Sequence, residues 1–146
     1  MLRILSFLCL IVLLPSCSST VSEPGTQNRG TDPQMVLDKN WQWVSTLTPV
    51  EKITVPAPER YTILLSETGR LQAQFDCNSG GGNYEISPGK LSFGPLLATR
   101  MACPPDSLGY RFMQDLQQVK LFFMQGGQLY LDLPMDGGTM RFRAAP

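Results

Sequence analysis

The sequence predicts a mainly β domain of the α+β class, a small antiparallel β-barrel-like domain with one α-helix at about residues 106–119. Three observations lead to this prediction. Short segments alternate apolar and polar side chains, as half-buried strands do. Glycine-containing turn sequences separate these segments. A single segment carries an apolar stripe at helical spacing, and one helix among about eight strands favours a curled antiparallel sheet with the helix over an opening.

The first residues have the layout of a secretory signal. Arg3 precedes an apolar run over residues 4–14, about half as long as the roughly 20 residues that span a bilayer. The run ends in the string LPSC at residues 14–17, which resembles the processing site of bacterial lipoproteins. The resemblance implies removal of residues 1–16 and acylation of Cys17. The alternative is ordinary cleavage nearby, which leaves a soluble periplasmic protein with Cys17 free.

An acylated Cys17 predicts a membrane partner and a location. Several acyl chains together anchor a protein stably, and Ser18 in place of aspartate favours the outer membrane, on its periplasmic face. Residues 17–37 are expected to be the acylated N-terminus and a flexible tether, because residues 18–34 are almost all polar, Gly or Pro. The folded domain is expected over residues 38–146.

Composition excludes several classes of activity. The chain has 12 basic and 12 acidic residues and no histidine. Without histidine, Ser-His-Asp and Cys-His catalysis and most catalytic zinc sites are excluded. No basic patch suited to nucleic acid stands out. We therefore expect a protein that is not an enzyme, with no catalytic residue, metal or cofactor and no nucleic-acid partner.

The first half of the domain shows two strand patterns. Residues 41–44, with tryptophan at 41 and 43, are a plausible first strand. Residues 50–60 contain two prolines, and we expect a connection there. Residues 71–75 alternate Leu, Ala and Phe with glutamine, which predicts a half-buried strand.

The second half predicts three further strands. Residues 120–124 are apolar on both faces and suit a central strand, whereas residues 129–133 and 140–144 alternate. Turns are expected where glycine supplies a positive φ: at residues 68–69, 88–89, 126–127 and 136–138.

The helix is predicted to begin after two prolines, with Asp106 as its N-cap. Its apolar residues recur at spacings of four, four and three and form one stripe. We expect this stripe to face the core, with a partner-binding face as the alternative. It consists of Leu108, Phe112, Leu116 and Val119.

Several short motifs, taken together with the spacing between them, resemble the META domain, also called HslJ-type. The string FDCN at residues 75–78 precedes a glycine run, and TRMAC follows at residues 99–103. A tryptophan opens the domain, and a helix with Phe and Leu precedes the closing strands. One departure is Asp76, where the family usually has glycine. The matching motif residues, for which we expect structural roles, are Trp41, Asn78, Tyr84, Thr99 and Met101.

The resemblance implies a small barrel-like fold without catalytic activity. Members of the family are envelope or surface proteins tied to stress responses, motility or drug tolerance. The implied function is a structural, stress-response or chaperone-like role at the outer membrane, with an envelope protein or a lipid as partner. The alternative is a binding module that holds a lipid or an acylated peptide in the barrel, as secretin pilot lipoproteins do. Inhibition of a wall-degrading enzyme is a less favoured variant.

Cys77 and Cys103 remain in the mature domain, and we expect a disulfide between them. The predicted compartment is oxidising, and a small core benefits from a cross-link. Closing a loop of about 26 residues stabilises by roughly 3–4 kcal/mol in the chain-entropy model. Metal binding, redox catalysis and two unpaired buried thiols are the alternatives.

Other polar residues have structural and functional interpretations. We expect Asn78 to bond local backbone at the turn into the glycine stretch, with ligand recognition as the alternative. Residues 80–82 lack the lysine and hydroxyl residue of a phosphate loop. Arg100 is either a solvated side chain or an anion contact. The carboxylates have no spacing that forces a catalytic pair; they include Asp76, Glu85, Asp106, Asp115 and Asp132.

Overall fold

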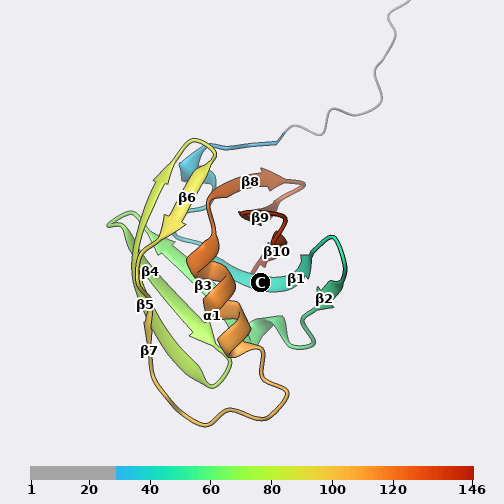
Figure 1. The fold of residues 1–146 in the computed structure, drawn as a ribbon. Coiled ribbons are helices and arrows are strands. Elements are labelled where there is room, and N and C mark those ends of the chain that lie inside the picture. Colours follow the sequence, from blue (N-terminus) through green and yellow to red (C-terminus); the bar gives the residue numbers. More distant parts are fainter. Residues whose placement is uncertain (1–28) are drawn as a thin grey trace, which may run out of the picture.

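The computed structural model describes residues 29–146 (Figure 1). The predicted signal peptide, the acylation of Cys17 and the tether as far as residue 28 therefore lie outside the described residues. The strands are β1 (Asn40–Leu47), β2 (Lys52–Thr54), β3 (Tyr61–Ser66), β4 (Arg70–Phe75), β5 (Asn78–Ser87), β6 (Lys90–Phe93), β7 (Leu97–Ala98), β8 (Leu121–Gln125), β9 (Gln128–Leu133) and β10 (Gly138–Ala144). The helices are α1 (Gly109–Gln118) and two 3-10 turns, Pro33–Met35 and Pro58–Arg60.

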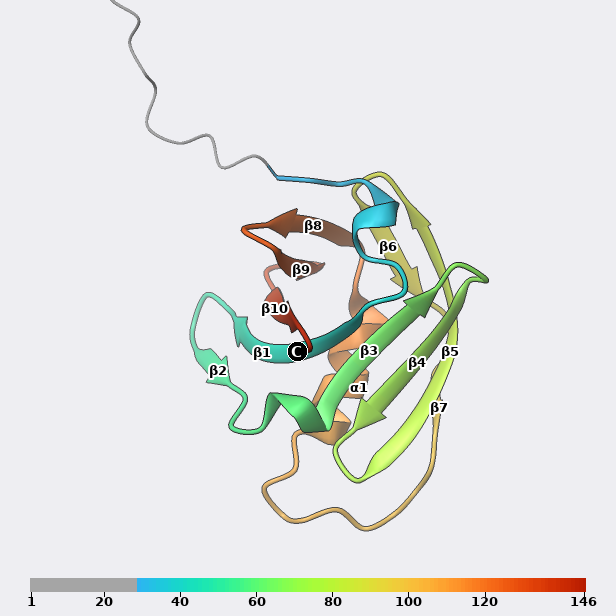
Figure 2. The same ribbon diagram turned by 180° about the vertical axis from the view of Figure 1, so that it is seen from behind.

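Eight antiparallel strands close into a barrel, in the order β1-β3-β4-β5-β6-β8-β9-β10 and back to β1. Two short strands lie outside the ring: β2 pairs with β1, and β7 pairs with β5. The predicted mainly β barrel with one helix is confirmed. The strand pairing that closes the ring is shortest between β6 and β8, where Lys90 and Leu121 form a single paired position. Figures 1 and 2 show α1 lying against the curved wall formed by β3 to β6.

The helix α1 contributes one central aromatic side chain, Phe112, to the interior of the barrel. Phe112 is fully buried and stacks on Trp43, with ring centroids 5.0 Å apart. Its ring also meets Tyr61 edge-on at 6.0 Å and lies 5.8 Å from Phe75 and 6.1 Å from Phe142. The predicted core stripe is confirmed at three positions, since Phe112, Leu116 and Val119 have no exposed surface. Further large side chains with under 2% exposure complete the interior: Trp41, Ile63, Leu65, Leu91, Phe122, Leu129, Leu131 and Met140.

The folded part begins before residue 38, so the last part of the expected tether belongs to the barrel. Gly30 and Met124 exchange two backbone hydrogen bonds of 2.9 and 2.7 Å. Val36 is fully buried, and its carbonyl accepts a 2.9 Å bond from the indole N–H of Trp41. Burial of Val36 and these backbone hydrogen bonds together hold the segment on the domain.

The helix begins three residues later than predicted. Asp106 is exposed in a turn and caps nothing. The Leu108 N–H instead donates to the Tyr61 hydroxyl at 3.0 Å, and the Gly109 N–H donates to Ser107 Oγ at 3.2 Å. A tertiary contact thus replaces the local cap that the sequence suggested.

Three strand expectations are corrected. Residues 50–60 are not only a connection, because they contain β2 and a 3-10 turn. The strand β8 has one buried face, since Leu121 is 47% exposed while Phe122 is buried. At the end of β10, Ala144 is exposed, because the strand has passed the edge of the core there.

The remaining local predictions hold. In β4, Leu71, Ala73 and Phe75 are buried and alternate with more exposed residues, as predicted. Each predicted turn contains glycine at positive φ, with values of 77° at Gly69 and 74° at Gly89. These conformations cost glycine little and other residues more.

Candidate functional site

The connection from β7 to α1, residues 99–108, is the candidate site and is called the strap below. It forms the long loop at the bottom of Figure 1. Its middle is tied to the tip of the β4–β5 hairpin by a disulfide between Cys77 and Cys103, with the Cα atoms 5.5 Å apart. The predicted disulfide is confirmed, and with both sulfurs bonded to each other the pair is not a set of thiolate ligands.

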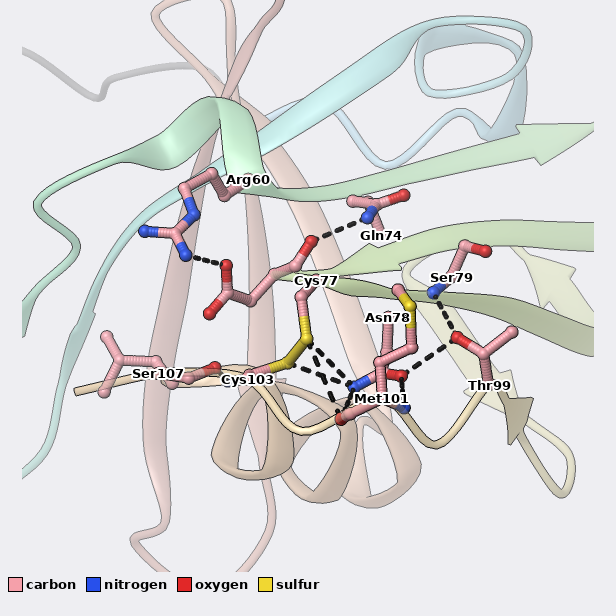
Figure 3. The surroundings of a disulfide bond; sticks show 12 residues. Arg60, Gln74, Cys77, Asn78, Ser79, Thr99, Met101, Cys103 and Ser107 are labelled. Carbon is pink, nitrogen blue, oxygen red and sulfur yellow. Dashed lines mark hydrogen bonds and ion pairs between the residues drawn. A yellow bond between two sulfur atoms is a disulfide. The ribbon is translucent and has the colours of Figure 1, made fainter. Parts of the chain in front are cut away.

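A second attachment lies beside the disulfide (Figure 3). The Asn78 side-chain carbonyl accepts bonds from the Thr99 hydroxyl (2.9 Å) and the Met101 N–H (2.7 Å). Its amide group donates to the Met101 carbonyl at 3.1 Å and contacts Cys103 Sγ at 3.1 Å. Thr99 Oγ1 also accepts the Ser79 N–H at 3.1 Å. The side chain of Asn78 therefore acts as a clamp on the strap.

The expectation that Asn78 bonds local backbone at a turn is wrong. It begins strand β5, and apart from a 3.6 Å contact with the neighbouring Cys77 Sγ its side-chain partners lie 21 to 25 residues along the chain. Sequence reasoning named Asn78, Thr99, Met101 and the two cysteines one by one. The structure brings all five together, which no local pattern predicts.

The glycine run lies in a strand rather than in a turn. A Cβ on Gly80 would lie 1.9 Å from the Leu97 carbonyl oxygen, and one on Gly81 would lie 2.1 Å from that of Leu71. Backbone atoms cannot yield to such contacts, so glycine is required for β4 and β7 to approach β5 this closely. The run therefore places β7, and with it the start of the strap.

Asp76 lies at the base of the strap and departs from the family pattern. Its φ is +65°, which glycine adopts without strain and aspartate tolerates better than most residues. Its carboxylate is 1% exposed and forms an ion pair with Arg60. The Gln74 amide donates to the Asp76 carbonyl at 2.6 Å. The aspartate thus keeps the turn and adds a buried charge that depends on one cation.

The other two motif residues lie away from the strap. Trp41 is buried and binds the N-terminal segment, as described above. The Tyr84 hydroxyl donates to the Ser66 carbonyl at 2.5 Å. Burial raises the pKa of Tyr84, and the negative charges of Asp38 and Glu67 add to this shift. The phenol therefore stays protonated as a hydrogen-bond donor at neutral pH.

A groove of about 610 Å³ lies between the strap, β7 and the first turn of α1. Its size is in the range of small-ligand sites. Its one charged lining residue is Arg100, which is exposed and has no ion-pair partner within residues 29–146. The lining consists of strap residues 99–103 with Phe75, Asn78, Ala98, Ser107, Gly109, Tyr110 and Met113.

The rim of the groove exposes apolar surface. Met101 is 59% exposed and Tyr110 71%. Solvent-exposed apolar side chains that gather around a hollow are typical of interaction sites. This gathering was not predicted from the sequence, because neither the rim nor the groove exists until the strap is clamped.

The carboxylates considered above have structural partners or face solvent. Asp115 is buried and accepts two bonds from Arg111 Nε, at 3.0 and 3.1 Å. Burial raises the pKa of Asp115, while Arg111 opposes this shift. Asp132 accepts from the Thr139 hydroxyl at 2.6 Å, and Glu85 and Asp106 are exposed.

Residues 29–146 also contain neither a metal-binding cluster nor a membrane-spanning helix. No three His, Cys, Asp or Glu side chains gather as a metal site would require. In the same part of the chain, no helix has the length and apolar character needed to cross a membrane.

Comparison with known proteins gives one family and three solved structures. Residues 34–146 match the META domain family. An NMR structure of a protein from Burkholderia xenovorans is 27% identical, with a TM-score of 0.65 over 84% of this chain and 97% of that chain. No curated protein matches the sequence.

The two other structures show the fold alone. A second NMR structure is 19% identical, with a TM-score of 0.59 over 77% of this chain and 93% of that chain. The crystal structure of a DUF4847 family protein from Bacteroides vulgatus is 11% identical, with a TM-score of 0.56 over 75% of this chain and 94% of that chain.

The variant Asn78→Ala is expected to destabilise the domain by about 1–3 kcal/mol, because three hydrogen bonds to Thr99 and Met101 are lost and each contributes roughly 0.5–1.5 kcal/mol net. Urea unfolding of the oxidised protein measures this change. Asn83→Ala is the control on the same strand, where an exposed side chain bonds only Arg70, and should change stability by less than about 0.5 kcal/mol. Equal effects of the two variants would contradict the clamp.

The variant Arg60→Ala is expected to destabilise by about 1–3 kcal/mol, because it leaves the buried Asp76 carboxylate unpaired. Adding Asp76→Gly should recover most of this loss, since glycine suits the positive φ and removes the charge. Thermal unfolding of the single and double variants compares them. A double variant no more stable than Arg60→Ala would refute the ion-pair account.

Proposed function

Because this chain belongs to the META domain family, we propose that it is a non-enzymatic envelope lipoprotein with a structural or chaperone-like role in envelope stress. Cys17 carries the acyl chains, and residues 17–29 link them to a domain on the periplasmic face of the outer membrane. The domain acts by binding a partner on its surface. The observation that supports surface binding is the clamped strap, which holds an apolar groove open to solvent.

The filled interior favours surface docking over a ligand inside the barrel. Two tryptophans and three phenylalanines with under 2% exposure occupy the interior, together with aliphatic side chains. Such close-packed cores leave few voids larger than a water molecule. A lipid or acylated peptide within the barrel would have to displace this core.

Two attachments at one point favour a docking role for the strap. A disulfide and the Asn78 clamp fix residues 99–103. The conformational entropy of this segment is therefore lost on folding, and binding of a partner does not have to reduce it again. A binding surface organised in this way needs no catalytic group. Within the described residues, the buried carboxylates bond structural partners and no second carboxylate, and the sequence has no histidine, which agrees with a non-enzymatic role.

The lipid anchor is tested by Cys17→Ser. This change is expected to abolish labelling of the protein by a palmitate analogue and to move it from the membrane fraction to the soluble periplasmic fraction. Cys9→Ser is the matched control, since Cys9 lies within the apolar run, and it should leave both readouts unchanged. Labelled or membrane-bound Cys17→Ser protein would contradict the anchor.

The docking role is tested by complementation in the source bacterium. We expect wild-type protein to restore the resistance of a deletion strain to detergent and heat, and Met101→Lys at the groove to fail at equal folded abundance. Met135→Lys is the control, because Met135 is 96% exposed on a distant loop. Equal rescue by both variants would contradict the role of the groove.

Turnover of ester, glycoside or disulfide substrates by the purified domain would contradict the proposal that the protein is not an enzyme.

A further inference from the structure

We propose that the groove between the strap, β7 and α1 binds an extended peptide of a partner protein, with apolar side chains in the groove and a carboxylate paired to Arg100. This inference rests on the proposed docking function and gives the chemistry of the partner. Three features of the described residues carry it: the composition of the lining, its charge and the free edge of β7.

The composition of the lining is that of a protein interface. Interface cores are enriched in aromatic residues, Met and Arg and depleted of Lys, Asp and Glu. The groove contains Tyr110, Met101, Met113 and Arg100 and has no lysine or carboxylate in its lining, although it also contains Ala98, Ala102 and Ser107, residue types that interfaces use less often. Methionine side chains are flexible and polarizable, so they adapt to apolar side chains of different shapes.

The charge of the groove sets the polarity of the ligand. Arg100 has no ion-pair partner in the described part of the chain, and the one carboxylate of the strap, Asp106, does not line the groove. A guanidinium presents a fork of donors that a carboxylate can accept in pairs. An apolar segment with one acidic side chain therefore matches the groove better than a basic or neutral one.

The edge of β7 favours an extended peptide over a fatty acid. The Thr99 N–H donates to the Ser79 carbonyl at 2.9 Å, so Thr99 faces β5. Because successive residues of an antiparallel strand face opposite sides, the N–H and carbonyl of Ala98 point away from β5. Within residues 29–146, β7 pairs with β5 alone. A peptide strand can bond these free groups, which an acyl chain cannot do.

The test is selection of random 12-residue phage-displayed peptides on the oxidised mature domain, followed by fluorescence anisotropy with the selected peptides. We expect enriched peptides with apolar residues and one Asp or Glu. Arg100→Glu should weaken their binding at least tenfold, and replacing the peptide's acid by Lys should restore binding to Arg100→Glu. Lys90→Glu is the control, since Lys90 is exposed outside the groove, and it should leave affinity unchanged.

Each other outcome overturns the proposal. No enrichment, peptides without an acid, or equal binding to Arg100→Glu would refute it. NMR shift changes confined to residues that do not line the groove would place the peptide elsewhere. Binding of dodecanoate with the same Arg100 dependence, without peptide binding, would identify a fatty-acid site, and self-association in light scattering would identify a second copy as occupant. A groove that binds no peptide while Met101→Lys still fails in cells would refute this ligand and leave the docking function standing.

Discussion

Phe112 joins the helix to the barrel through contacts with four aromatic rings on β1, β3, β4 and β10. A small barrel of eight strands has room for side chains in its interior, and here the helix supplies the central one. Once this ring is in place, the first turn of α1 lies beside the end of β4, where the Gly109 backbone approaches the Phe75 carbonyl. The core therefore fixes the C-terminal end of the strap, and the shape of the groove depends on the position of that end.

The other end of the strap is fixed by β7 on β5, and its middle is fixed by Cys103 and Asn78. A connection of ten residues held at three places has little freedom left, although its backbone forms no regular structure. The clamp also explains why this region can expose apolar side chains. A mobile loop with Met101 would let this side chain collapse onto the nearest apolar surface, whereas a fixed loop keeps it in solvent.

Local patterns in the sequence predict the parts of this fold that depend on local physics. Alternation predicts β4, β9 and β10, and glycine predicts the turns, because burial of one face and positive φ act residue by residue. The partners of Asn78 and the start of α1 depend on contacts between distant segments, and no period or spacing encodes them. The role of the glycine run also depends on such contacts, because two neighbouring backbones require glycine at Gly80 and Gly81. The groove appears only when all these long-range contacts are made.

The two strands outside the closed ring, β2 and β7, differ in how their free edges are protected from pairing with other chains. Unpaired edges invite association, and proteins usually protect them with charged residues or shorten them. β2 begins at Lys52, and the adjacent Glu51 lies near Arg111, so charge protects that edge. β7 is two residues long, its Leu97 is 79% exposed and its Ala98 lines the groove, with Arg100 as the nearby charge. Its shortness limits pairing between copies, but its surface is not that of a protected edge. The arrangement is understandable if a partner covers this edge when the protein is at work.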